Sequence, residues 1–251
     1  MKKTKIEWTE ATWNPSIGCT KISDGCAHCY AEVMAKRLQA MGNKDYKDGF
    51  VFKILPERLN EPKKTARPTR FFVNSMSDLF HDNMPYNYLD KIFEVISLTP
   101  QHTYQILTKH EKNMFDYFSK RVVPKNVWLG VTVENGKYKH RIDYLKQIEA
   151  SIRFISFEPL IGPIGELDLS SIHWCIVGGE SGPKARLIKK DWIIEIFEHC
   201  KEQNVSFFFK QWGTWGSDGI KRNKKLNGKV FLGKKWNEYP KCRVPVFNKN
   251  Y

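Results

Sequence analysis

Apolar runs and amphipathic segments alternate along this 251-residue chain, and that order leaves few fold classes open. The runs are rich in β-branched or aromatic residues and cover residues 70–73, 103–107, 127–133, 153–157, 173–177 and 205–209. Most of them are apolar at successive positions, which is typical of strands covered on both faces. Strands that alternate with helices form parallel sheets, so the chain is predicted to be an α/β protein.

Helical spacing of apolar residues occurs between the runs, at 86–98, 111–118, 137–148 and 191–203, and a further helix is expected at 30–39. With one more strand before Cys19, the pattern favours a (β/α) barrel, either a full or a partial TIM-type barrel, for which this length is common. A doubly wound open sheet is the alternative, although no G-x-G-x-x-G motif follows an early strand.

Two domains of unequal size are expected. Residues 1–213 are predicted to form the barrel with an N-terminal three-cysteine loop, and residues 214–251 a basic, glycine-rich segment packed on it, with a hairpin turn at 226–230. Residues 43–68 form a long connection with three prolines. Long connections in compact domains are often functional, and this one could act as a lid.

The net charge of +14, from 41 lysines and arginines against 27 acidic residues, favours contact with a polyanion, above all nucleic acid. Cations mixed with aromatic side chains near the C-terminus suit phosphate contact and base stacking. The residues expected to contact DNA or RNA are Lys221, Arg222, Lys224, Lys225, Lys234 and Lys235. A solvated surface hairpin is the alternative for the same residues.

No apolar run approaches the roughly 18 residues of a membrane span, so no membrane contact is expected. The N-terminus also lacks the apolar segment of a secretory signal. We therefore expect a cytoplasmic protein whose six cysteines are reduced, metal-bound or inert.

Three cysteines close together carry the strongest chemical signal. Cys19, Cys26 and Cys29 have the spacing C-x6-C-x2-C, and Gly18 and Gly25 make the longer arm flexible. A helix that begins after Cys29 would stabilise thiolate charge through its N-terminal dipole. Three thiolates leave one iron of a [4Fe–4S] cluster free, which is the arrangement needed to bind and reduce S-adenosylmethionine (SAM).

Zinc is the first alternative for these thiols. A structural zinc ion needs a fourth ligand, which could come from His28, His81, Cys175, Cys200 or Cys242. No second C-x2-C pair exists, so such a site would have to close at long range. Three free thiols in a turn are the remaining possibility.

Polar or glycine residues follow each apolar run, and in a β/α barrel these positions share the end where active sites lie. The residues expected to bind the cofactor are Tyr30, Asn74, Ser75, Asp78, Thr108, Thr132, Gly178, Gly179 and Glu180, and those expected to act in catalysis are Lys109, Glu158 and Glu180. For any single residue, a helix cap or a loop salt bridge is an equal alternative. Glu158 and Glu180 would also permit a cofactor-free hydrolase, but that hypothesis leaves the three cysteines unexplained.

Motifs along nearly the whole chain resemble a phage-associated family of unknown function with a three-cysteine motif. They lie at 12–15, 18–21, 25–26, 29–32, 72–81, 106–109, 128–134, 156–160, 178–182, 209–213 and 236–240. The resemblance implies a phage or prophage origin, with the host cytoplasm as location. It also implies kinship with radical SAM barrels, near those acting on nucleic acid such as spore photoproduct lyase. The common radical SAM motif has three residues between its first two cysteines and an aromatic residue before the third, whereas this chain has six and His28.

These features together predict a radical SAM-type enzyme that uses a [4Fe–4S] cluster to cleave SAM and abstracts hydrogen from an unknown substrate, which could be a nucleic acid. A partner protein is a further possibility. The alternative is a zinc-stabilised phage nucleic-acid-binding protein without catalysis.

Overall fold

Seven parallel strands form the central sheet, in the order β1-β4-β5-β6-β7-β8-β9. They are β1 (Ala11–Trp13), β4 (Arg70–Val73), β5 (Thr103–Thr108), β6 (Val127–Thr132), β7 (Ile152–Phe157), β8 (Trp174–Gly178) and β9 (Ser206–Gln211). The structure is a computed structural model that describes Thr4 and residues 6–241. All six predicted strands are confirmed, with ends that differ by at most two residues.

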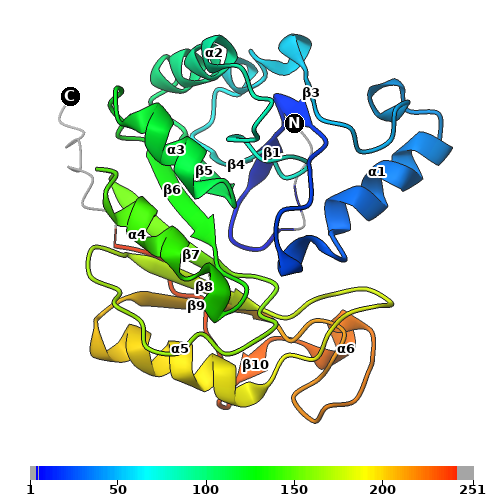
Figure 1. Ribbon diagram of the computed structural model, residues 1–251, viewed down its shortest axis with the longest axis vertical. Helices are drawn as coiled ribbons and strands as arrows, with labels where there is room; N and C mark the ends of the chain where they lie inside the picture. The colour runs from blue at the N-terminus through cyan, green and yellow to red at the C-terminus, as the bar shows by residue number, and fades with distance from the viewer. Residues whose placement is uncertain (1–3, 5, 242–251) are drawn as a thin grey trace.

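The sheet is an open, partial barrel whose edges are β1 and β9 (Figure 1). The prediction of a full barrel is therefore wrong, because the outer edge of β9 is hydrogen-bonded to a later segment of the chain and not to β1. The backbone N–H of Phe209 donates to the carbonyl of Trp236, and Phe208 forms an antiparallel bridge with Asn237. The doubly wound alternative is also wrong, since the strands lie in chain order and the sheet grows in one direction only.

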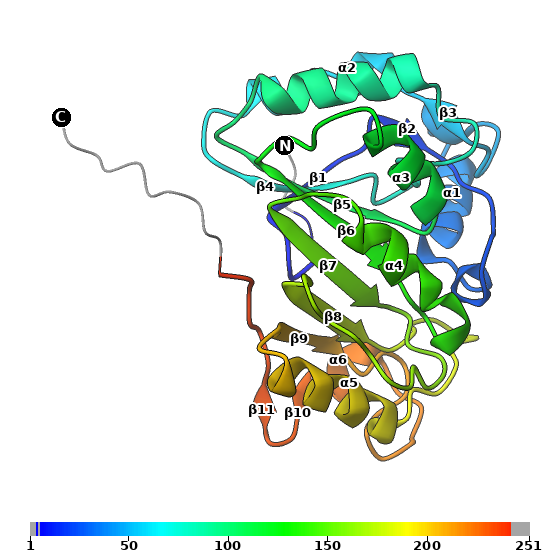
Figure 2. The same ribbon diagram turned by 60° about the vertical axis from the view of Figure 1, so that its left-hand side comes forward.

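Four helices cover one face of the sheet: α2 (Tyr86–Ser97), α3 (Glu111–Phe118), α4 (His140–Lys146) and α5 (Lys190–Glu202) (Figure 2). Helix α1 (Tyr30–Ala40) follows the three-cysteine loop and stands apart from that layer. The predicted helix at 137–148 is divided into a 3-10 turn, η5 (Gly136–Tyr138), and the shorter α4. Within the described part of the chain, no helix combines the length and apolar character that crossing a membrane requires.

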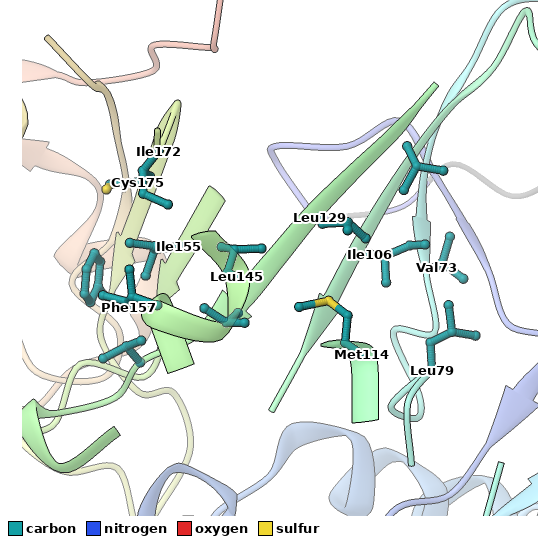
Figure 3. Packing of buried hydrophobic residues seen from close by; sticks show 14 of the residues in the cluster. Val73, Leu79, Ile106, Met114, Leu129, Leu145, Ile155, Phe157, Ile172 and Cys175 are labelled. Atoms are coloured by element: carbon teal, nitrogen blue, oxygen red, sulfur yellow. The ribbon is translucent and has the colours of Figure 1, made fainter. Parts of the chain in front are cut away.

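Side chains along each strand alternate between two apolar layers. Figure 3 shows the layer between sheet and helices, where Val73, Ile106 and Leu129 lie near Met114 of α3, and Ile155 near Leu145 of α4. The residues of the opposite, concave layer are Trp8, Phe72, Trp128, Ile152, Phe154, Trp174, Ile176 and Phe208. This two-sided burial explains why the strands are apolar at successive positions.

The concave layer has aromatic side chains near the beginnings of the strands and small side chains near their ends. Trp174 is completely buried, and its ring lies 6.0 Å from that of Trp128 and 5.8 Å from that of Phe154. Further along the same face come Gly130, Thr132, Ser156 and Gly178. A Cβ atom on Gly130 would lie 2.5 Å from the Phe154 ring. The aromatic residues therefore close the amino end of the concave face, and the carboxyl end is lined by small side chains.

The C-terminal segment forms α6 (Lys224–Asn227) and a hairpin of β10 (Val230–Phe231) and β11 (Lys234–Lys235). The hairpin turn predicted at 226–230 is wrong, because Gly228, at φ 66°, ends α6 instead. The actual turn is Leu232-Gly233, whose φ angles of 47° and 78° suit the right-handed twist of a two-residue hairpin. The remaining residues of the predicted segment, 242–251, lie outside the described residues.

Candidate functional site

The three-cysteine loop, residues 18–29, begins at the carboxyl end of β4. Gly18 forms a parallel bridge with Ser77, and its N–H donates to the Met76 carbonyl at 2.9 Å. The Ser77 hydroxyl donates back to the Gly18 carbonyl at 2.7 Å. The loop therefore starts at the edge of the sheet where a barrel enzyme places its active site.

Residues 43–68 support this loop and do not form a free lid. Within them, β3 (Lys53–Ile54) pairs with β2 (Ser16–Ile17), and the Cys19 N–H donates to the Phe50 carbonyl at 3.2 Å. Gly18 has φ 78°, and a Cβ atom there would lie 2.1 Å from the Val51 carbonyl oxygen. Only glycine allows the two chain segments to approach so closely.

Glu134, just beyond β6, anchors the middle of the loop. Its side chain is completely buried and accepts a hydrogen bond from the Ser23 hydroxyl. Arg141 compensates the buried charge, with Nη1 2.9 Å from Glu134 Oε2, and Lys109 Nζ lies 3.6 Å from Oε1. Because a buried carboxylate needs such partners, Glu134 is held firmly and fixes the position of Ser23.

Gly25 packs directly on Glu134, and this contact gives a testable expectation. A Cβ atom at Gly25 would lie 2.5 Å from Glu134 Cγ, and Glu134 cannot move because Arg141 holds it. We expect Gly25→Ala to destabilise the loop by about 1–3 kcal/mol. Tryptic cleavage after Lys21 should then be at least about 5-fold faster. Ala27→Val enlarges an exposed residue of the same loop and should leave the cleavage rate unchanged. Equal tryptic cleavage rates for Gly25→Ala and Ala27→Val would contradict the importance of the contact between Gly25 and Glu134.

Glu180, beyond β8, holds the end of the loop through two contacts. Its Oε2 lies 3.2 Å from His28 Nδ1, and Arg186 binds both carboxylate oxygens. Arg186 also donates to the Asp24 carbonyl at 2.9 Å. Burial opposes ionisation of Glu180 most strongly, yet the hydrogen bonds from Arg186 and His28 outweigh it and hold the pKa of this carboxyl below its usual value. Both carboxylate oxygens of Glu180 are therefore already bonded to other groups of the protein.

The three cysteines lie within electrostatic range of one another. Burial is the main cause that raises the pKa of the Cys19 thiol to about 12, and charges on Asp78, Cys26 and Cys29 contribute to the same rise in that order. Each of two thiols has a local partner: Cys19 Sγ donates to the Thr20 carbonyl, and Cys26 Sγ lies 3.4 Å from Ser23 Oγ. Among the residues that the structure describes, no three His, Cys, Asp or Glu side chains are already drawn together as metal ligands.

The thiols nevertheless fit an iron–sulfur cluster in their chemistry and position. All three are free and partly exposed, on one loop anchored behind β4, β6 and β8. Iron–sulfur clusters take thiolate ligands. The loop backbone is fixed by bonds to its neighbours, whereas the thiols make only weak sulfur hydrogen bonds. The Cys19 and Cys26 side chains can therefore rotate without breaking a strong hydrogen bond.

The other residues proposed as zinc ligands are distributed unevenly. Cys175 and Cys200 are buried in the core between β8 and α5, away from the loop. His81 is nearer, with Nε2 3.0 Å from the Thr20 hydroxyl, and His28 is engaged by Glu180. Cys242 lies outside the described residues.

Several residues predicted to bind a cofactor make bonds within the protein. Asp78 accepts hydrogen bonds from the Thr108 hydroxyl at 2.6 Å and from the Lys109 N–H at 2.9 Å. The Asn74 side chain bonds to Ser16, and the Tyr30 hydroxyl donates to the Ser75 carbonyl. These hydrogen bonds fix the polar residues at the carboxyl ends of β4 and β5, next to the three-cysteine loop. Their role in binding a cofactor remains a prediction, as does that of Thr132.

Gly178, the last residue of β8, and Gly179, which follows it, have packing roles. A Cβ atom on Gly179 would lie 1.9 Å from the Trp212 carbonyl oxygen, so the chain after β9 passes directly over it. A Cβ atom on Gly178 would lie 2.5 Å from Glu158 Oε1. Backbone N–H contact with a ligand stays a prediction for both glycines.

Glu158 and Lys210 form an ion pair among the strand ends. Lys210 Nζ lies 3.1 Å from Glu158 Oε1, and the Lys210 and Glu158 side chains are only 23% and 14% exposed, respectively. Unlike Glu180, the Glu158 carboxylate has a single described hydrogen-bond partner, Lys210. A carboxylate and an ammonium that stand next to small residues at the open end of the concave face can both receive a polar ligand.

Sequence reasoning missed the residues that fix the loop: Ser23, Glu134, Arg141 and Arg186. Glu134 carried a signal, because it follows β6 as the other polar residues follow their strands. Ser23 and Arg186 carried none, because the contacts by which they fix the loop, with Glu134 and the Asp24 carbonyl, span 111 and 162 residues of the sequence.

The predicted nucleic-acid contacts lie on two separate elements. Lys221, Lys224 and Lys225 lie in and just before α6, whereas Lys234 and Lys235 form β11. Arg222 is paired with Asp218, and Lys234 Nζ lies 3.6 Å from the centre of the Trp236 ring. The Lys221 ammonium donates to the Pro183 carbonyl, beside the chain that leads from Glu180 to Arg186. Contact of these residues with DNA or RNA stays a prediction.

Comparisons with known proteins give one family and several solved structures. The family model described as "Protein of unknown function (DUF5131)" matches residues 3–240. A search among curated proteins finds no match. A tyrosine-to-phenylalanine variant of spore photoproduct lyase is similar in structure, with a TM-score of 0.49, 13% identity and coverage of 92% of this chain and 76% of that one.

Two further structures of the same lyase are similar. The lyase complexed with dinucleoside spore photoproduct has a TM-score of 0.48 at 14% identity, with 80% of this chain and 63% of that chain covered. A cysteine-to-serine variant has a TM-score of 0.47 at 15% identity, with 71% and 58% covered. In these two comparisons, the chain thus spans about 58% to 63% of the length of the lyase chain.

Proposed function

We propose that this chain, which belongs to the DUF5131 family of proteins of unknown function, is a radical SAM-type enzyme with an iron–sulfur cluster on Cys19, Cys26 and Cys29. The observation that carries the proposal is the anchoring of the three-cysteine loop at the carboxyl edge of a parallel, partial barrel. Bonds from residues beyond β4, β6 and β8 hold that loop in place.

Three thiolates would hold a [4Fe–4S] cluster and leave one iron free. When bound, such a cluster supplies one electron for the cleavage of SAM to methionine and a 5′-deoxyadenosyl radical. The protein's own contribution is position and shielding. Glu134 and Glu180 fix the loop over the strand ends. The aromatic residues around Trp174 exclude water from the amino end of the concave face.

Glu158 and Lys210 are proposed to bind the ligand's polar groups at the open end of the concave face. Both are largely shielded from solvent, so a new hydrogen bond to either replaces little water. Lys109, paired at 3.6 Å with Glu134, lies at the other side of the loop and is proposed to counter thiolate charge. Its positive charge already offsets a part of the rise in the Cys19 pKa that burial causes.

The proposal predicts the effect of one neutral substitution. Glu158→Gln keeps the shape and removes the charge that Lys210 and the ligand share. We expect 5′-deoxyadenosine formation to fall at least about 10-fold, the value of one charged hydrogen bond. Iron content should be unchanged. The matched control is Asp168→Asn, which breaks the surface pair with Lys146 and should leave the rate as it is. A wild-type rate in Glu158→Gln would remove this residue from the site.

The function itself is tested on protein purified and reconstituted without oxygen. We expect a brown protein that contains iron and sulfide and forms 5′-deoxyadenosine from SAM when dithionite is added. A colourless protein with stoichiometric zinc would overturn the proposal. It would support the alternative of a zinc-stabilised nucleic-acid-binding protein, whose DNA or RNA binding should then survive Glu158→Gln but not chelation.

A further inference from the structure

We propose that the chain segments beyond β8 and β9 form a binding surface for single-stranded nucleic acid. The surface, called the rim patch below, consists of two stretches, residues 181–190 after β8 and residues 214–228 after β9. No part of it belongs to the three-cysteine loop. The inference therefore goes beyond the proposed function and holds with or without a cluster.

The rim patch concentrates positive charge. Its first stretch contains four cations and no acid, and its second contains four cations and one acid, Asp218. With eight cations against one acid, the two stretches carry a net charge of +7, half of the +14 of the whole chain. The acids that flank the first stretch in the sequence are Glu180, which Arg186 binds, and Asp191 in the first turn of α5. Such a local excess of positive charge attracts a polyanion.

Most of these cations are available to a ligand. Lys184, Lys224 and Lys225 are exposed and have no acidic partner among the residues that the structure describes. Lys221 is also exposed, and its ammonium donates to the Pro183 carbonyl. Because an ammonium has three donors and a carbonyl carries no full charge, Lys221 keeps both its charge and further donors for phosphate oxygens.

Hydrogen bonds between the two stretches join them into one surface. The indole Nε1 of Trp215 donates to the Ala185 carbonyl at 2.6 Å, and the Gly182 N–H donates to the Thr214 hydroxyl at 2.9 Å. The lysines of both stretches are therefore held on a common scaffold, which lets several of them contact the same phosphate backbone.

The rim patch adjoins the three-cysteine loop. Asn227 Nδ2 donates to the carbonyls of Gly213 and Thr214 at 3.0 Å and 2.8 Å, which packs α6 on the carboxyl end of β9. Arg186, in the first stretch, donates to the Asp24 carbonyl of the loop at 2.9 Å. A strand bound to the rim patch would therefore pass beside the open end of the concave face.

Exposed apolar side chains and the shortness of α6 favour a single strand. Ile220 and Leu226 are 52% and 77% exposed among the lysines and can contact the faces of unstacked bases, which only a single strand presents. Helix α6 has four residues, too few to enter the major groove of a duplex. A membrane surface is less suitable, because it is bound by an amphipathic helix with a large apolar face.

The test measures fluorescence anisotropy of labelled RNA and DNA strands of about 12 nucleotides with the full chain, with and without its reconstituted cluster. We expect both forms to bind. The double variant Lys224→Ala with Lys225→Ala should bind at least about 10-fold more weakly at low salt. The slope of log Kd against log salt should fall by about 1.4, because each lost phosphate contact contributes about 0.7. Lys63→Ala with Lys64→Ala removes two exposed, adjacent lysines of η4 (Pro62–Lys64) and should bind as wild type.

Other polyanions identify what the rim patch recognises. A duplex of the same length, inorganic polyphosphate and vesicles of phosphatidylglycerol should each bind at least about 5-fold more weakly than a single strand, since they present no unstacked bases. Binding of either the RNA or the DNA strand supports the proposal, and the ratio of the two shows whether the 2′-hydroxyl is read.

Several results would overturn the rim patch. They are no binding of either strand, equal dissociation constants for the two double variants, equal binding of polyphosphate, duplex or vesicles, and loss of binding when the cluster is removed. Failure of the reconstituted wild type to cleave SAM would overturn only the proposed function, because binding to the cluster-free chain still reports on the rim patch.

Discussion

If the proposed function holds, we expect Cys26→Ala to bind no iron and to lose all SAM cleavage. Cys26 is the first residue of the C-x2-C pair and lies in the loop segment that Ser23 and Gly25 press against Glu134. Loss of a residue that only supports a metal ligand costs 10–100-fold in affinity, so loss of a ligand should cost more than about 100-fold. Iron, sulfide and 5′-deoxyadenosine are measured after anaerobic reconstitution.

The matched control for this experiment removes a thiol elsewhere. Cys200 is buried in α5 with no part in the loop, so Cys200→Ala should cost roughly 1 kcal/mol of stability and leave the iron content unchanged. Circular dichroism should show that Cys26→Ala remains folded, since Cys26 lies outside the core. If Cys26→Ala kept a full complement of iron, the three-cysteine site would be refuted.

Arg141→Met will destabilise the whole protein. Arg141 is 3% exposed and donates from Nη1 to the Thr132 carbonyl at 2.8 Å and to Glu134 at 2.9 Å. Without it, Glu134 is a completely buried carboxylate with only Lys109, 3.6 Å away, to compensate its charge. Breaking a buried ion pair from one side costs about 3–5 kcal/mol, which urea unfolding measures.

A second variant shows whether charge or packing causes that loss. The double variant Arg141→Met with Glu134→Gln also removes the completely buried carboxylate charge, and replacement of both partners of a buried pair is close to neutral. We expect the double variant to recover most of the free energy of unfolding. A loss of less than about 1 kcal/mol in Arg141→Met, or no recovery in the double variant, would contradict the role given to this pair.

Local patterns identified the strands and helices because each pattern reflects burial on the element itself. The run at 70–73 is β4 without change, and 111–118 is α3 without change. The hairpin at 226–230 failed, because Asn227-Gly228 resembles a turn signal but serves to end α6. The Asn227 side chain bonds to the carbonyls of Gly213 and Thr214, which are distant contacts that no local pattern contains.

The candidate site was likewise predictable from the sequence only in part. The three cysteines are evident from their spacing, and Glu158 from its place after β7. Which carboxylates remain available was not evident: Glu180 is taken by Arg186, Asp78 by Thr108 and the Lys109 N–H. The partners of Asp78 come from the end of the neighbouring strand β5, whereas Arg186 follows Glu180 by six residues in the connection after β8.

The amino-acid sequence by itself determined the α/β class, the parallel strands and the grouping of three cysteines, because these follow from spacing along a single segment. Only the tertiary structure decided that the barrel stays open, that residues 43–68 brace the loop, and that Glu134 and Glu180 fix it. The physical reason is that an edge strand, a buried charge or a packed glycine is defined by its neighbour. In this protein that neighbour lies elsewhere in the chain, as with Phe209 and Trp236, or Gly25 and Glu134.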